Sequence, residues 1–303
     1  MKTLYTHRAS AGVRILLVLL ALLLVAGFAA GCAGDGDTPP PDGSNGEEPT
    51  DTVPPDDDSE EPADATTDLY IYLVRGETLG VAMRTVPQTV AVAEAALNEL
   101  LAGPTEEDVE AGLASEVPEG TELLGVSISD GVATVDLSPE FEAGGGSLSM
   151  QLRVAQVVFT LTRFPTVDTV AFEIDGAPVE AIGGEGVVVS PPVSRAAFAD
   201  NTLPAILVES PAPWEEVSSP LRVTGMSNTF EAAFAYEVVD QAGLIVAEGS
   251  GMATAGTGTW GTFDVTIPFE ITREGIGSLI VFEYSAKDGS RVNLVEIPLR
   301  FAE

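Results

Sequence analysis

Residues 123–137 read LLGVSISDGVATVDL, a segment from which most of the N-terminal architecture can be inferred. Two runs of alternating apolar residues, 123–129 and 132–137, flank the pair Asp130-Gly131. Asp-Gly between two such runs favours a β-hairpin, because both residues tolerate the positive φ angles of a tight turn. We therefore expect a hairpin whose turn is Asp130-Gly131.

The sequence around this hairpin changes between strand and helix periodicity. Thr105, followed by three acidic residues, predicts the N-cap of a short helix. Alternation and helical spacing predict strands over 68–74, 79–86 and 167–174, and helices over 89–101 and 147–163. These elements predict an α+β domain over residues 69–190.

The C-terminal third is typical of an all-β domain. Seven short strand-like runs separated by Gly, Pro, Asn and Asp predict an immunoglobulin-like β-sandwich over 205–303, after a linker over 191–204. No cysteine lies in this region, so its core must form by packing alone. The aromatic residues expected to contribute are Trp214, Phe234, Trp260, Phe263 and Phe282.

The N-terminus has the organisation of a secretion signal. Residues 1–14 are basic, 15–26 are all apolar, and small residues follow up to Cys32. This pattern predicts a signal peptide over 1–31; a retained membrane helix or a soluble secreted product are the alternatives. The run Ala29-Ala30-Gly31-Cys32 resembles a bacterial lipobox, although Ala29 stands where Leu is usual. The resemblance implies that the Cys32 thiol is acylated, with palmitate as a typical chain.

Residues 32–68 predict a lipidated cysteine followed by a disordered, acidic, Pro-rich tether. Residues 33–68 contain 13 acids, 7 prolines and no Lys or Arg. Such a segment cannot bury enough apolar surface to offset its ordering entropy. The run Asp56-Asp57-Asp58 lacks the glycine and alternating spacing of a calcium loop. We expect the tether to hold the folded region away from the membrane.

The charge balance excludes one class of partner. The formal net charge is −34 at pH 7, and residues 69–303 carry 34 acids and 10 bases. Phosphate backbones would be repelled by such a surface, so we expect no nucleic-acid partner. Anionic lipid headgroups would be repelled as well, so contact with the membrane is expected only through the anchor.

The residue types restrict the chemistry that the chain can perform. His7 and Cys32 are the only histidine and cysteine, and both lie at the N-terminus. Sites that need imidazole or thiolate are thus disfavoured, and we expect no catalytic residue, no cofactor and no metal. Three weak enzymatic candidates stay open. Glu173 with Asp175, or Glu215 with Glu216, could form a carboxylate pair like that of glycosidases. Lys287 could belong to a Ser-Lys dyad, although it lies in a predicted turn.

Three features are candidates for binding. The glycine-rich segment Gly144–Ser147 precedes a predicted helix, whose N-terminus favours anions. Trp214 and Trp260 are candidates for glycan contact if they are exposed, with core packing as the alternative. Arg153 and Arg163 lie on the predicted helix, and we expect them to pair with surface acids or to face a partner.

Short motifs in both regions resemble known families. Those of the first region are Leu101–Thr105, Val117–Thr121, Asp130–Ser138 with Phe141, Gln156–Thr162 and Ile174–Gly176. Together they resemble the GerMN domain of the sporulation and spore germination family, over roughly 68–185. Ser210–Pro213, Ser218–Leu221, Gly256–Phe263, Val281–Ser290 and Glu296–Leu299 resemble the immunoglobulin-like domain of bacterial spore germination.

The two resemblances imply a non-enzymatic function. Relatives are extracytoplasmic, and some related modules help to build rings in envelope machines. We expect a lipoprotein anchored to the outer face of the cell membrane through Cys32 that acts as a protein-interaction or assembly module, linked to sporulation or germination. Envelope proteins are the expected partners. Cell-wall glycan binding is the alternative function, and a homo-oligomer is left open.

Overall fold

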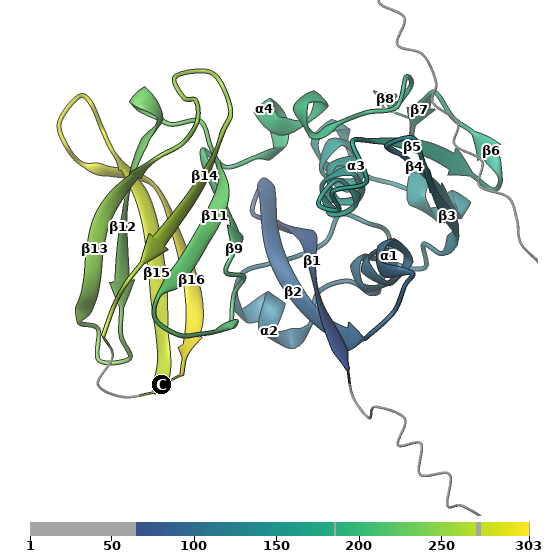
Figure 1. Ribbon diagram of the computed structural model, residues 1–303. Coiled ribbons are helices and arrows are strands. Elements are labelled where there is room, and N and C mark those ends of the chain that lie inside the picture. Colours follow the sequence, from purple (N-terminus) through teal and green to yellow (C-terminus); the bar gives the residue numbers. More distant parts are fainter. Residues whose placement is uncertain (1–64, 185, 271–273, 303) are drawn as a thin grey trace, which may run out of the picture. The chain divides into compact units, whose positions relative to one another are not determined.

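The computed structural model describes residues 65–184, 186–270 and 274–302 (Figure 1). All the described residues fall in one compact unit. The predicted signal peptide, Cys32 and nearly all of the predicted tether lie outside the described residues.

The α+β region begins with a long two-stranded hairpin and continues with two helices and a four-stranded sheet. The sheet has the strand order β3-β4-β5-β6, in which β4 and β5 are parallel and the other pairs antiparallel. The elements are β1 (Thr66–Arg75), β2 (Thr78–Pro87), α1 (Val92–Ala102), α2 (Glu106–Glu110), β3 (Leu123–Ser129), β4 (Val132–Leu137), the 3₁₀ turn η1 (Pro139–Glu142), α3 (Ser147–Leu161), β5 (Thr169–Ile174), β6 (Ala177–Pro178), β7 (Ala181–Ile182) and β8 (Val187–Val188).

Helices α1 and α3 lie between the β1–β2 hairpin and the β3-β4-β5 sheet (Figure 1). Helix α3 is buried along almost its whole length, which explains why its sequence carries apolar residues on more than one face. Its two fully buried polar side chains, Gln156 and Thr160, form hydrogen bonds with the backbone of Tyr72 on β1. Tyr72 N donates to Thr160 Oγ1 at 3.0 Å, and Gln156 Nε2 donates to the Tyr72 carbonyl at 3.1 Å.

The predicted hairpin is confirmed as β3–β4. Asp130 and Gly131 have φ angles of 50° and 80°, the left-handed conformation that a tight turn requires. A Cβ at Gly131 would lie 2.5 Å from Oδ2 of Asp168, an exposed side chain that can move, so the turn conformation is what favours glycine here. The predicted cap of α2 is confirmed as well: Thr105 and Asp108 form a reciprocal capping box.

The C-terminal region is a β-sandwich, and all seven predicted strand runs form strands. Its sheets have the orders β10-β16-β15-β12-β13 and β14-β11-β9. The strands are β9 (Ile206–Ser210), β10 (Glu216–Val217), β11 (Leu221–Ser227), β12 (Ala233–Val239), β13 (Ile245–Met252), β14 (Gly261–Ile267), β15 (Gly275–Tyr284) and β16 (Arg291–Phe301), with the 3₁₀ turn η3 (Phe230–Ala232) before β12.

Phe234 and Phe263 form the aromatic centre of the sandwich, with ring centroids 4.6 Å apart. Phe282 is buried, but it does not belong to this core: its ring lies beside Tyr284 and the Arg291 guanidinium. Trp214 and Trp260 differ from the prediction of core residues, because both are only half-buried. Each donates its indole N–H to a residue outside the sandwich strands, so neither can enter the sandwich core.

The segment 191–204, expected to be a linker, contains ordered elements. It holds the 3₁₀ turn η2 (Arg195–Ala197) and the short helix α4 (Ala199–Thr202). Phe198 and Leu203 are buried in the core of the α+β region. Leu207 and Ala212 of the sandwich belong to the same core. The two modules therefore share apolar packing and do not hang from a flexible connection.

Candidate interaction site

Several polar side chains contact one another where the α+β module meets the sandwich. We call Tyr72, Arg163, Arg195 and Glu209 the junction cluster. Glu209 on β9 accepts a hydrogen bond from the Tyr72 hydroxyl and one from Arg195 Nη1 at 2.6 Å. Its second oxygen lies 3.8 Å from Arg163 Nη1. One carboxylate of the sandwich thus binds one hydroxyl and two guanidinium groups.

The junction cluster is largely excluded from water. The Glu209 side chain is 12% exposed, and that of Arg195 is 21% exposed. Arg195 also donates to the Phe159 carbonyl at 3.0 Å and lies over the Phe159 ring. Burial raises the pKa of Tyr72, and the neighbouring Glu209 carboxylate adds to the rise. Tyr72 therefore stays protonated and keeps donating to Glu209.

A second set of contacts lies beside the junction cluster. Tyr70 donates from its hydroxyl to Glu215 Oε2 at 3.2 Å, and the Arg163 guanidinium lies 4.4 Å from the centre of the Tyr70 ring. The Ala212 backbone N–H donates to the same Glu215 oxygen at 2.8 Å. Burial raises the pKa of Glu215, against the effect of these two hydrogen bonds.

Both tryptophans contribute to the junction. Trp214 Nε1 donates to the Glu107 carbonyl at 2.8 Å, and Arg300 Nη2 pairs with Glu107 Oε1 at 2.6 Å. Trp260 Nε1 donates to Asp200 Oδ1 at 2.8 Å. Each indole therefore uses its only polar group within the chain. The Arg300 guanidinium lies 5.5 Å from the Trp214 ring centre.

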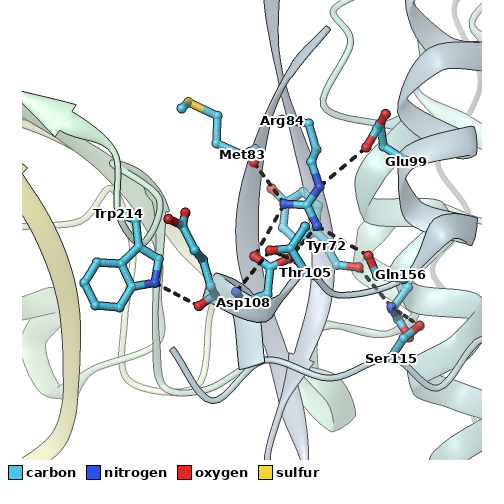
Figure 2. A network of polar contacts seen from close by, with 11 residues as sticks. Tyr72, Met83, Arg84, Glu99, Thr105, Asp108, Ser115, Gln156 and Trp214 are labelled. Carbon is cyan, nitrogen blue, oxygen red and sulfur yellow. Dashed lines mark hydrogen bonds and ion pairs between the residues drawn. The ribbon is translucent and has the colours of Figure 1, made fainter. Parts of the chain in front are cut away.

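A network of polar contacts around Arg84 and Asp108, beside Trp214, holds helix α2 in place (Figure 2). Arg84 on β2 is directed towards Glu99 on one side and Asp108 on the other. Asp108 is 5% exposed, and its Oδ2 also accepts from the Thr105 N–H at 2.7 Å. The Asp108 carboxylate thus caps α2 and also pairs with Arg84. These two contacts fix α2, and with it the Glu107 carbonyl that accepts the Trp214 hydrogen bond.

Arg153 is placed differently from the expectation of a surface ion pair. It is 3% exposed and donates to backbone carbonyls of Glu116 at 2.8 Å, Phe141 at 2.6 Å and Ala143 at 3.1 Å. A Cβ at Gly145 would lie 3.1 Å from its Nη2 atom. The glycine-rich segment at Gly144–Ser147 therefore packs against Arg153, an arginine with a structural role. Arg163 pairs with an acid, as one of the two expectations had it, but that acid is the largely buried Glu209 of the junction cluster.

The weak enzymatic candidates are not assembled into a site. Glu215 is held at the junction, whereas Glu216 is exposed on β10. Asp175 occupies the turn after β5 with a φ of 51° and is exposed. Lys287 is exposed in the turn between β15 and β16. None of these residues lines any of five well-formed cavities in the ranges that the structure covers.

No cluster of three or more His, Cys, Asp or Glu side chains in the described ranges is arranged to hold a metal ion. No helix within those ranges is long and apolar enough to cross a membrane. Cys32 lies outside them, so its lipidation stays a prediction.

Comparison with protein families supports the resemblance seen in the motifs. A model described as "Sporulation and spore germination" matches residues 56–180. A second, "Immunoglobulin-like domain of bacterial spore germination", matches residues 205–290. These matches confirm the predicted GerMN-like domain followed by an immunoglobulin-like domain. Neither is a known catalytic family.

Three solved structures are similar to parts of the chain. The first GerMN domain of the sporulation protein GerM from Bacillus subtilis has 30% identity and a TM-score of 0.37, covering 43% of this chain and 99% of that one. The tandem GerMN domains of the same protein have 21% identity and a TM-score of 0.40, covering 67% and 62%. A putative lipoprotein from Clostridium perfringens has 20% identity and a TM-score of 0.34, covering 46% and 93%. No curated protein matches the chain.

Proposed function

The chain belongs to the sporulation and spore germination family, and from this premise we propose that it is a non-catalytic, membrane-anchored lipoprotein of the cell envelope. In this proposal it acts as a protein-interaction or assembly module in sporulation or germination. The observation that carries the proposal is the junction: two spore-germination domains, each with its own core, pack together through Leu207 and Ala212 and are tied by Glu209.

The junction suits a scaffold better than an active site. Its charged groups are matched to each other: Glu209 faces Arg195 and Arg163, and Glu107 faces Arg300. A catalytic site instead keeps a nucleophile or base free for the substrate. A rigid pair of modules can present surfaces of both to one partner without the entropy cost of ordering a hinge.

The exposed surface of the sandwich offers places for such contacts. Its large exposed apolar side chains include Phe230, Leu244, Met252, Ile276 and Tyr284. Scattered apolar residues are normal on a protein surface, so they do not identify the partner. They do provide contact area that the acidic remainder of the surface lacks.

The anchor is tested by metabolic labelling. Labelled palmitate should enter the wild-type chain and should be absent from Cys32→Ser, because only a thiol at this position can carry the acyl chain. Equal labelling of both chains would contradict the anchor.

The envelope function is tested in cells that lack the chain. Loss of spore yield or of germination should be restored by the wild-type chain and not by Cys32→Ser, provided that both accumulate equally. Normal sporulation and germination without the chain would overturn the proposal.

The glycan alternative has its own test. If the full chain binds purified cell wall, and Trp214→Ala or Trp260→Ala abolishes this binding without unfolding the chain, the glycan function would replace the assembly function. Binding that is absent in the wild type would remove the alternative.

A further inference from the structure

A cavity of about 390 Å³ lies near the tip of the β1–β2 hairpin. Its wall comes from β2, β9 and β16, and most of the lining is apolar: Leu79, Val81, Ile206, Leu294 and Ile297. The volume is in the range of cavities that hold small organic ligands. We call this space the Arg75 cavity, because Arg75 is the one basic residue in its lining.

Arg75 differs from the other arginines that the structure describes. Those at 84, 163, 195, 222, 291 and 300 each pair with a carboxylate, and Arg153 is surrounded by backbone carbonyls. Among the described residues Arg75 has no ion-pair partner, and its one hydrogen bond there is a long one, 3.4 Å from Nη1 to the Glu296 carbonyl. Its Nε atom is buried and has no hydrogen-bond partner among the described residues.

A buried N–H group without a partner is costly, and Arg75 Nε is such a group, although Arg75 as a whole is only partly buried. Glu296, the one acidic residue in the lining, offers Arg75 only its backbone carbonyl. Residues 69–303 contain 34 acids and 10 bases. Burial lowers the pKa of Arg75, as expected when desolvation of a cation is not balanced by a nearby anion. A buried N–H normally has a hydrogen-bond partner, so an anion that is not part of the chain and accepts from Arg75 Nε would complete this site.

We propose that the Arg75 cavity binds a small apolar monocarboxylate whose carboxylate pairs with the Arg75 guanidinium. The planar guanidinium matches a carboxylate in a two-pronged pair. A single negative charge is favoured, because Glu296 also lines the cavity and the chain is strongly acidic, so each further charge would be repelled. The apolar lining would take up the hydrocarbon part of the ligand.

Two sources share this chemistry: a free fatty acid and the C-terminal carboxylate of an apolar peptide. Hexanoate represents the first and N-acetylleucine the second. Hexanamide, which has the same size as hexanoate and no charge, is the control ligand. The full chain in lipid nanodiscs is titrated with each probe by calorimetry. Partition of a probe into the nanodisc lipid is the same for every variant and is subtracted.

We expect saturable binding of at least one carboxylate, and the tighter of the two identifies the source. Binding should weaken at least about tenfold in Arg75→Gln and for hexanamide, since the charge-assisted pair is lost. Arg222→Gln is the matched control, because Arg222 is exposed and paired on the sandwich surface, and binding to it should be unchanged.

A second variant keeps the charge and changes the space. Ala111 lines the Arg75 cavity, so Ala111→Leu should weaken binding by filling it while Arg75 stays in place. This variant keeps the test valid if Arg75→Gln does not fold. Absence of saturable binding of both carboxylates, equal binding of hexanamide, or undiminished binding to Arg75→Gln would overturn the proposal.

Discussion

Replacement of Glu209 by alanine tests the junction cluster at its centre. The change removes the one carboxylate that faces Arg195 and Arg163 and that accepts the Tyr72 hydroxyl. Tyr72 is fully buried, and the two arginine side chains are 21% and 25% exposed. No water can easily replace the lost oxygen atoms around Tyr72, so the variant keeps buried donors without an acceptor.

The expected loss follows from the burial of the cluster. Breaking a buried ion pair by removing one partner costs about 3–5 kcal/mol, because the other charge stays buried and unpaired. For a folded unit of this size, 1 kcal/mol shifts the Tm by about 2–4 °C. The Tm of Glu209→Ala should therefore fall by about 6–20 °C.

The assay is urea unfolding and calorimetry of the full chain in detergent, with Asp264→Ala as the matched control. Asp264 makes a two-pronged pair with Arg222, with distances of 2.7 and 3.0 Å, as short as those in the junction cluster. That pair is exposed, so its loss should cost at most about 1 kcal/mol. Similar small losses in Glu209→Ala and Asp264→Ala would refute the inference that the junction couples the modules.

Three further predictions concern single positions. Glu215→Gln should become more stable relative to the wild type as the pH rises. Burial raises the pKa of Glu215 in the folded state. The wild type therefore loses the stability that this carboxyl contributes as the pH rises from about 4.3, its value in the unfolded chain, through the raised folded-state pKa, and the Gln variant does not. Urea unfolding at pH 4 and pH 7 measures this gain, and a wild-type-like pH dependence would contradict it. Gly225→Ala should cost about 1–3 kcal/mol or more, because its Cβ would lie 2.1 Å from the Leu207 carbonyl; Gly125→Ala, with open space at its Cβ, is the control and should be close to neutral in the same assay. Arg153→Met should cost about 1–3 kcal/mol by leaving buried carbonyls unpaired, which a Tm equal to that of the wild type would disprove.

Much of the fold could be predicted because its signals are local. Asp130-Gly131 between alternating runs specifies its own turn, and Thr105 with Asp108 specifies its own cap. The strands of the sandwich were predictable for the same reason. Each signal lies within a few residues of the structure that it predicts.

The junction could not be predicted, because its contacts join residues far apart in sequence. Tyr72 and Glu209 are 137 residues apart, and no periodicity relates them. The segment 191–204 is too short for a periodic pattern, so its buried Phe198 and Leu203 gave no signal. Arg153 was expected at the surface since arginine usually is. Only the tertiary position of the Glu116 and Phe141 carbonyls explains its burial.

Cross-linking in intact cells tests the central claim, that this chain acts through protein contacts at the membrane, most directly. The chain is purified through its C-terminus, and its cross-linked partners are identified by mass spectrometry for the wild type and for Cys32→Ser. The account predicts a reproducible set of envelope proteins that is linked to the wild type and lost from Cys32→Ser. Wall fragments recovered without protein partners would contradict it, whereas links only between copies of the chain would identify a homo-oligomer.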